Sequence, residues 1–208
     1  MNVLILCNGR PPGAGLFSHV YDWADFFIAA DGGGNVARSF NRLPDLVIGD
    51  LDSFVQRTDD PFEVVFDPGQ ETNDLEKALT AARNKNAGNV IVLGATGLRL
   101  DHSLKNLSVL RQFNPYFNQL IFKDEFSDIF LLPKTFTAEL PVGTRISLFP
   151  LSGIVKGIRT EGLKFPLKNE SLENGVRDGS SNEVAASPVK ITHDEGDLIC
   201  FIDRPEQP

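Results

Sequence analysis

Five short apolar runs in the first half of the chain most constrain its fold. They are Val3–Cys7, Phe26–Ala30, Leu46–Ile48, Glu63–Phe66 and Val90–Leu93, and a Gly, Asp or Asn follows each of them. Nearly continuous apolar runs are typical of strands buried on both faces, as in a parallel sheet covered by helices. Helical patterns lie between some of these runs, and the alternation predicts an open, mostly parallel α/β (Rossmann-like) domain.

Two helical patterns belong to this domain. Between Thr72 and Arg83, small and apolar side chains recur at helical spacing, and Asn73 with Glu76 fits a capping box at the start. A second helix is expected from about Ser103. We expect its inward-facing side chains to be Leu104, Leu107, Leu110 and Phe113.

The second half of the chain has a different pattern. Short strand-like segments, such as Ile129–Leu132 and Leu198–Ile202, alternate with Gly and Pro, and no helical period lasts beyond a turn or two. This pattern is typical of a small antiparallel sandwich or barrel, and we expect an antiparallel β-sandwich. The polar, Gly-rich stretch 175–182 is expected to be a loop. The sequence thus predicts two domains, residues 1–123 and 124–208.

The composition excludes several classes of function. With 20 Lys and Arg against 28 Asp and Glu, the net charge is −8, so the basic surface typical of nucleic-acid-binding proteins is missing. No apolar run approaches the roughly 20 residues that span a bilayer, and the first residues do not resemble a signal peptide. The two cysteines are far apart and form no CxxC motif. We therefore expect a cytoplasmic protein that binds neither nucleic acid nor membranes.

Carboxylates collect where the predicted strands end. Asp31 follows one apolar run, Asp50 and Asp52 follow the next, and Asp74 lies beyond the fourth. Ligands of open α/β sheets bind at the carboxyl ends of the strands, which parallel strands bring to one edge. Hard oxygen ligands suit Mg²⁺, while neighbouring glycines and the guanidinium of Arg99 can contact phosphate. A single Asp after a strand is more often a turn former or helix cap, so the predicted Mg²⁺–polyphosphate site depends on their co-location.

Common nucleotide-binding motifs do not explain this site. The chain has no GxxxxGK[ST] loop, and no GxGxxG follows the first apolar run. Instead, five segments match the motifs of one family in order and spacing. They are Asp31–Asn35, Pro44–Ser53, Thr72–Leu79, Gly94–His102 and, in the second half, Glu161–Leu167 followed by Ser181–Glu183. Through these segments the chain resembles the thiamine pyrophosphokinases over nearly its whole length.

The resemblance implies a fold and an activity. It implies an N-terminal α/β domain that binds ATP and Mg²⁺, and a C-terminal β-sandwich that binds thiamine and forms a homodimer. The active site of such dimers lies between the α/β domain of one subunit and the sandwich of the other. The implied reaction transfers the pyrophosphoryl group of ATP to the hydroxyl of thiamine, which attacks the β-phosphorus and gives thiamine diphosphate and AMP.

The resemblance also implies a role for each matched residue. The implied Mg²⁺ ligands are Asp50, Asp52 and Asp74, and the implied thiamine contacts are Ser181 and Asn182. The implied catalytic residues are Asp50, Asp52, Asp74, Arg99 and Asp101. The implied ATP site comprises Asp31, Gly32, Gly33, Asn35, Gln70, Thr72, Arg99 and His102. Three places depart from the family pattern: Leu98 stands where many members have Gly, Asn73 where Thr is common, and Gln70-Glu71 where bacterial members often have Lys-Asp. The last resembles the Gln-containing variants of the family.

Two other functions stay open from the sequence. A strand that ends in Asp50-Leu51-Asp52 also fits an aspartyl-nucleophile phosphatase, in which the first Asp attacks phosphorus. The second half of the chain has no role in that account. A non-catalytic sensor that binds nucleotide or thiamine is the other alternative. The full set of carboxylates favours an enzyme, because binding alone does not require three carboxylates on a metal.

Overall fold

The computed structural model describes residues 1–204 and divides the chain into two compact units. The first unit is Met1–Glu125, and the second begins at Phe126. The division therefore falls after residue 125, where the sequence predicted a boundary after residue 123.

The first unit contains a parallel sheet in the order β6-β5-β1-β2-β3-β4. The α/β prediction is confirmed, and the five expected strands are all present, although β6 was not predicted. Burial explains the apolar runs, because Val3, Leu4, Ile5 and Leu6 of the central strand are inaccessible to solvent. The strands are β1 (Asn2–Leu6), β2 (Phe26–Ala30), β3 (Leu46–Gly49), β4 (Glu63–Phe66), β5 (Asn89–Leu93) and β6 (Gln119–Lys123).

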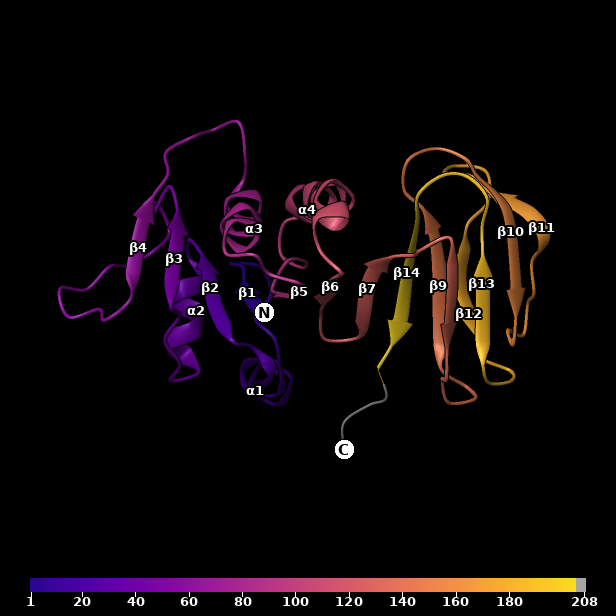
Figure 1. The fold of residues 1–208 in the computed structure, drawn as a ribbon, viewed down its shortest axis with the longest axis horizontal. Coiled ribbons are helices and arrows are strands. Elements are labelled where there is room, and N and C mark those ends of the chain that lie inside the picture. Colours follow the sequence, from indigo (N-terminus) through magenta and orange to yellow (C-terminus); the bar gives the residue numbers. More distant parts are fainter. Residues whose placement is uncertain (205–208) are drawn as a thin grey trace. The chain divides into compact units, whose positions relative to one another are not determined.

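Helices cover both faces of this sheet (Figure 1). Helices α1 (Ala14–Trp23) and α2 (Gly33–Ser39) lie on one face, and α3 (Asp74–Asn84) and α4 (Leu100–Phe113) lie on the other. From β1 to β3 the chain moves across the sheet in one direction through α1 and α2, and from β4 to β6 it moves in the opposite direction through α3 and α4. Because crossovers between parallel strands are right-handed, opposite directions place the two pairs of helices on opposite faces. Within residues 1–204, no helix is long and apolar enough to cross a membrane.

The helices agree with the sequence at α3 and differ at α4. The capping box of Asn73 and Glu76 is present, and α3 begins at Asp74. Helix α4 begins at Leu100 instead of Ser103, and Leu104, which was expected to face inward, is 57% exposed. The buried positions are Asn106, Val109, Leu110 and Phe113. The expected stripe was wrong at its start because the buried face begins with a polar residue, Asn106, which a search for apolar side chains at helical spacing passes over in favour of Leu104.

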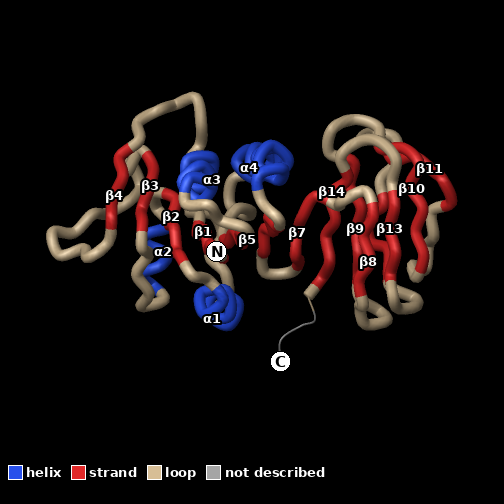
Figure 2. The backbone as a smooth tube through the Cα atoms, viewed as in Figure 1, coloured by secondary structure: helices blue, strands red, loops and turns tan. Residues whose placement is uncertain are grey.

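The second unit is a sandwich of two antiparallel sheets, with the strand orders β12-β9-β14-β7 and β11-β10-β13-β8. Over residues 126–204 this unit contains no helix, in contrast to the first unit (Figure 2). Buried side chains from both sheets form one core, so the predicted β-sandwich is confirmed. The strands are β7 (Ser127–Leu131), β8 (Thr135–Ala138), β9 (Arg145–Pro150), β10 (Val155–Glu161), β11 (Lys168–Leu172), β12 (Gly179–Glu183), β13 (Val189–Thr192) and β14 (Leu198–Asp203).

One expected loop of the second unit is partly a strand. The prediction of a loop over 175–182 was wrong for residues 179–182, which belong to β12 and pair with β9. The register shifts between Gly179 and Asn182, and β12 lies at the end of its sheet. An edge strand made of Gly, Ser and Asn has no apolar alternation, so its sequence is typical of a loop.

Candidate active site

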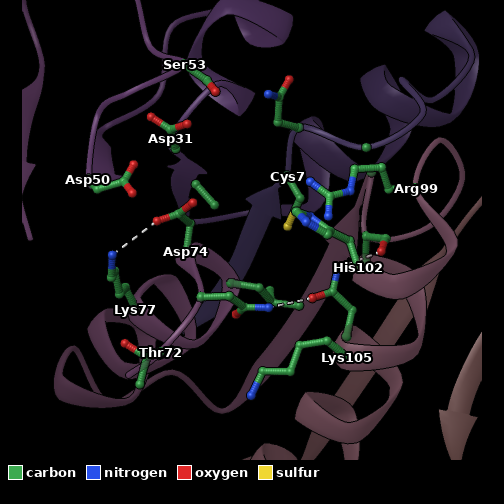
Figure 3. A pocket seen from close by; sticks show the side chains of 18 of the residues that line it. Cys7, Asp31, Asp50, Ser53, Thr72, Asp74, Lys77, Arg99, His102 and Lys105 are labelled. Atoms are coloured by element: carbon green, nitrogen blue, oxygen red, sulfur yellow. Dashed lines mark hydrogen bonds and ion pairs between the residues drawn. The ribbon is translucent and has the colours of Figure 1, made fainter. Parts of the chain in front are cut away.

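A cavity of about 600 Å³ lies at the carboxyl edge of the parallel sheet, where the sequence predicted a site. The loops that follow β1 to β5 all contribute to its lining, together with residues of α3 and α4. Figure 3 shows that the acidic side chains gather on one side of this cavity, while Arg99 and His102 lie on the other. Of the predicted site residues, the cavity is lined by Asp31, Asp50, Asp52, Gln70, Thr72, Asp74, Arg99 and His102.

Three carboxylates form the centre of the acidic side. Asp31 follows β2, Asp50 follows β3 and Asp74 begins α3, and one carboxylate oxygen of each lies within 4.8 Å of the other two. Asp52 lines the cavity but lies outside this set, and its carboxylate accepts a hydrogen bond from Ser53 Oγ at 2.8 Å. The geometry thus groups Asp31, in place of Asp52, with Asp50 and Asp74. The role of Asp52 as a metal ligand stays a prediction.

Charge repulsion within this cluster is partly compensated by the protein itself. Asp31 is only 4% exposed, and its pKa is raised because of burial and, less strongly, because of the charges of Asp74 and Asp52. Lys77 supplies the compensating charge, with Nζ 3.3 Å from Asp74 Oδ1 and 2.8 Å from the Asp67 carbonyl oxygen. The Lys77 side chain is 3% exposed. A donor set made only of carboxylate oxygens fits a hard divalent cation such as Mg²⁺.

Asp31→Asn should stabilise the metal-free protein at neutral pH. Because the folded pKa of Asp31 is raised from 3.8, ionisation costs folding free energy, and stability falls as pH rises from the unfolded to the folded pKa. In the wild-type protein the Phe54 N–H donates to Asp31 Oδ1 at 3.2 Å. The side-chain amide of the variant still has an oxygen that accepts this bond. We expect a gain of about 0.5–2 kcal/mol near pH 7 that shrinks toward about pH 4. Thermal unfolding in chelator measures it, and a lower unfolding temperature than wild type near pH 7 would contradict it.

Left-handed backbone conformations recur around the cavity. Asp31, Leu51 and Leu98 have φ values of 45°, 58° and 55°. Such values are costly for residues other than Gly, and they persist where the surrounding structure imposes them. Leu51 separates Asp50, which belongs to the cluster, from Asp52, which lines the cavity outside it.

The loop after β3 is fixed by the side chain of Asn35, which was expected in the ATP site. Asn35 Nδ2 donates to the Ser53 carbonyl oxygen at 2.8 Å, and its Oδ1 accepts from the Val55 N–H at 3.1 Å. Arg38 adds a bond to the Val55 carbonyl oxygen at 2.6 Å and lies over the Phe54 ring. Asn35 does not line the cavity, so the structure gives it a supporting role for the Asp50–Asp52 loop.

Glycines allow main chain to pack against main chain below the cavity. A Cβ at Gly9 would collide with the Gly94 carbonyl oxygen, and a Cβ at Gly94 would lie 2.6 Å from the Cys7 carbonyl oxygen. Gly94 also has a φ of 68°, which favours glycine. Of the predicted nucleotide glycines, Gly32 abuts Asn8 and Gly33 abuts the Leu6 carbonyl oxygen, and neither lines the cavity.

Arg99 is held by Asp101 at the start of α4. Its Nε donates to Asp101 Oδ1 at 3.1 Å and its Nη2 donates to Oδ2 at 2.5 Å. These bonds lower the pKa of Asp101 to about 2. Asp101 is therefore ionised at neutral pH and is a poor proton acceptor. It does not line the cavity, whereas Arg99 and His102 do.

Two further polar residues lie on the acidic side. Gln70 Nε2 is 3.5 Å from Asp50 Oδ2 and 3.3 Å from the Pro68 carbonyl oxygen, and Thr72 is exposed at the rim. Cys7 also lines the cavity, but burial and the charge of Asp74 raise its pKa to about 12. A thiol that stays protonated is a poor nucleophile at neutral pH.

Sequence reasoning did not assign Lys77, Lys105 or Asn106 to the cavity, which all three line. Lys77 lies three residues after Asp74, so helical spacing alone could have placed the two side chains together. Lys105 Nζ pairs with Glu76 Oε2 at 2.9 Å. Asn106 shares helical spacing with the buried Leu110 and could have been recognised as an inward-facing polar residue.

Ser181 and Asn182 line a different cavity, of about 410 Å³, in the second unit. The Asn182 amide is buried and engaged within the chain. Its Oδ1 accepts from the Phe165 N–H at 3.1 Å and from the Glu183 N–H at 2.9 Å, while Nδ2 donates to the Phe165 carbonyl oxygen at 2.8 Å. Ser181 is exposed, with a φ of 58°. Ser181 thus offers a side chain to a ligand, whereas Asn182 fixes the loop at Phe165.

Fold and site together define an α/β protein with an acidic cavity suited to a divalent cation and to phosphate groups. Two family models match the chain: the catalytic domain of thiamin pyrophosphokinase over residues 17–122, and the vitamin B1 binding domain of thiamin pyrophosphokinase over residues 135–198. The chain belongs to the thiamin pyrophosphokinase family.

Individual proteins agree with this assignment. The chain is 30% identical over 217 residues to thiamine pyrophosphokinase 1 of Oryza sativa subsp. japonica, covering 88% of this chain and 80% of the relative. It is 28% identical to thiamin pyrophosphokinase 1 of Caenorhabditis elegans, covering 90% and 84%. The thiamin pyrophosphokinase structure from Geobacillus thermodenitrificans superposes with a TM-score of 0.84 at 25% identity, covering 100% and 99%. The Candida albicans structure has a TM-score of 0.87 at 19% identity, covering 97% and 88%, and shows the shared fold.

Proposed function

We propose that this protein transfers the pyrophosphoryl group of ATP to the hydroxyl of thiamine, which gives thiamine diphosphate and AMP. Membership of the thiamin pyrophosphokinase family supports the proposal. The observation that carries it is the placement of the Asp31, Asp50 and Asp74 carboxylates across one cavity from Arg99 (Figure 3). In that arrangement, one bound nucleotide would contact both a cation held by the carboxylates and the guanidinium of Arg99.

The residues that would hold Mg²⁺ are Asp50 and Asp74, with Asp31 beside them and Asp52 as the further predicted ligand. When bound, Mg²⁺ would neutralise phosphate charge and polarise the phosphoryl oxygens. Lys77 keeps Asp74 in place through the ion pair at 3.3 Å. The three carboxylates therefore lie ready for a cation, without large movement of the main chain.

The chain's own contribution to the reaction is positioning and charge stabilisation. A bond forms between the thiamine hydroxyl oxygen and the β-phosphorus, the bond from the β-phosphorus to the oxygen of AMP breaks, and the hydroxyl proton is released. Arg99 would bind the phosphate oxygens where negative charge develops, and Asp101 would orient its guanidinium. The low pKa of Asp101 argues against its acting as the base. Gln70, Thr72 and His102 would complete the ATP site around the cavity.

The second domain is part of the same proposal. Its match to the vitamin B1 binding model supports a role in thiamine binding, with Ser181 in contact and Asn182 acting through the Phe165 loop. The homodimer, with its active site between subunits, and the cytoplasmic location are likewise proposed. The two free, buried cysteines, Cys7 and Cys200, are compatible with a reducing compartment.

The test is the release of AMP from ATP and Mg²⁺, with and without thiamine. We expect thiamine-dependent AMP and thiamine diphosphate in equal amounts, no product in excess chelator, and full recovery when Mg²⁺ is restored. Thiamine diphosphate is detected by fluorescence after oxidation. Absence of AMP with an active control enzyme would overturn the proposal, and hydrolysis of small phosphate esters without ATP would favour a phosphatase instead.

A further inference from the structure

A buried side-chain amide links two loops on either side of the cavity. Asn106, on α4, is 8% exposed. Its Nδ2 donates to the Ala95 carbonyl oxygen at 2.7 Å, in the loop that leads to Arg99. Its Oδ1 accepts from Asn73 Nδ2 at 2.9 Å, and Asn73 directly precedes Asp74. The side-chain amide of Asn106 therefore bonds both the segment that leads to Arg99 and the residue that precedes Asp74, and these two are predicted catalytic residues.

On the Arg99 side, three consecutive carbonyl groups are held. The Gly9 N–H donates to the Gly94 carbonyl oxygen at 2.9 Å, and the Arg10 N–H donates to the Thr96 carbonyl oxygen at 3.0 Å. The Ala95 carbonyl between them is held by Asn106. The chain then adopts φ values of 80° and 55° at residues 97 and 98 before it reaches Arg99. Anchoring before this strained turn fixes the point from which the Arg99 side chain departs.

On the Asp74 side, both ends of the Asn73 amide are used. Its Oδ1 caps α3 by accepting from the Glu76 N–H at 2.9 Å, which leaves Nδ2 free to donate to Asn106. The Asn73 N–H is bound by Glu76 Oε2 at 2.9 Å. A serine at position 73 would still cap the helix but would lack the Nδ2 that reaches Asn106.

We propose that Asn106 is a positioning residue that fixes the placement of Asp74 relative to Arg99 through this pair of hydrogen bonds. It acts through Asn73 and Ala95 and needs no contact with substrate. The inference rests on the proposed function, in which Asp74 and Arg99 engage the same nucleotide. Without the bonds, the Ala95 carbonyl and the Asn73 amide lose buried partners, and each loop gains freedom to move apart.

Three variants separate positioning from stability. Asn106→Leu keeps the volume and removes both hydrogen bonds, Asn106→Asp keeps the acceptor for Asn73 but loses the donor to Ala95, and Asn73→Ser keeps the cap but loses the link. Ser108→Ala, at an exposed position two residues further along α4, is the matched control. The measurements are kcat and KM for ATP, calorimetric binding of the Mg²⁺ complex of α,β-methylene ATP, and hydrogen exchange of the 94–99 and 70–76 segments.

We expect Asn106→Leu to lower kcat/KM for ATP by about 10- to 100-fold, to weaken analogue binding by about tenfold and to speed exchange in both segments. The loss in the Asn73→Ser/Asn106→Leu double variant should equal that of the larger single loss, because both changes cut the same link. If Asn106→Leu unfolds, Asn106→Asp and Asn73→Ser carry the same test.

Wild-type kinetic constants and analogue affinity in folded Asn106 variants would overturn the inference, since a merely structural role lowers only the unfolding temperature. Additive losses in the double variant would also overturn it. Should the wild-type protein fail to form thiamine diphosphate, the proposed function fails. The positioning role is then still decided by analogue binding and by exchange in the two segments.

Discussion

Asp74→Asn is expected to lower kcat for thiamine diphosphate formation by at least about a thousandfold while the protein stays folded. Asp74 contributes one of the three clustered carboxylates, and the variant removes its charge while keeping its size. The amide oxygen still has Lys77 Nζ as a donor, so the start of α3 should be unaffected. The measurements are thiamine-dependent AMP release and calorimetric titration with Mg²⁺ and ATP, with circular dichroism to monitor the fold.

Asp22→Asn, at an exposed position on α1, is the matched control and should leave kcat unchanged. Asp52→Asn, measured alongside, tests the predicted ligand that lies outside the carboxylate cluster. A loss as large as that of Asp74→Asn would place Asp52 on the metal. Normal turnover in Asp74→Asn would remove Asp74 from the proposed metal site and with it the main support for the mechanism.

Arg99→Lys is expected to lower kcat/KM for ATP by about a hundredfold, and Arg99→Ala by about a thousandfold. Lysine keeps the positive charge but cannot make the paired bonds from Nε and Nη2 that Asp101 now receives, nor offer a planar fork to phosphate. Because the pair is largely exposed, the unfolding temperature should hardly change. Steady-state kinetics with varied ATP at saturating thiamine provide the measurement.

Arg42→Lys serves as the control for this series, since Arg42 contacts the Tyr21 ring and does not line the cavity. Asp101→Asn adds a second comparison. It disturbs only the orientation of the Arg99 guanidinium, so we expect a smaller loss of kcat/KM for ATP than in Arg99→Ala. Equal kinetics for wild type and Arg99→Ala would show that phosphate binding does not depend on this residue.

The parallel sheet could be predicted because β1 to β3 and β5 carry almost continuous apolar side chains and are followed, directly or one residue later, by Gly, Asp or Asn. The second unit was harder. Strands β8, β11 and β13 are four or five residues long and mix Lys, Thr or Glu with single apolar side chains. The burial of these strands depends on pairing with strands that lie elsewhere in the sequence, so the local pattern of residues does not predict it.

For the site, topology alone brings carboxylates at successive strand ends to one edge, so Asp31, Asp50 and Asp74 could be expected together. The sequence could not separate Asp31 from Asp52, because that distinction depends on the conformations of two loops, the one after β2 and the one after β3, and both contain left-handed residues, Asp31 and Leu51. Nor could it show that Asn35 holds a neighbouring loop. An asparagine that contacts a ligand and one that contacts main chain have the same sequence signature.

The close packing of Gly9 against Gly94 limits how this cavity can be redesigned. Main chain forms that part of the wall, so no side chain there can be enlarged, shortened or recharged to admit a different nucleotide. Directed evolution would have to work through exposed residues of the rim, such as Gln70, Thr72 and His102. A library randomised at these three positions would retain the fold and sample new recognition, whereas one randomised at Gly9 or Gly94 would consist largely of chains that cannot close the two loops.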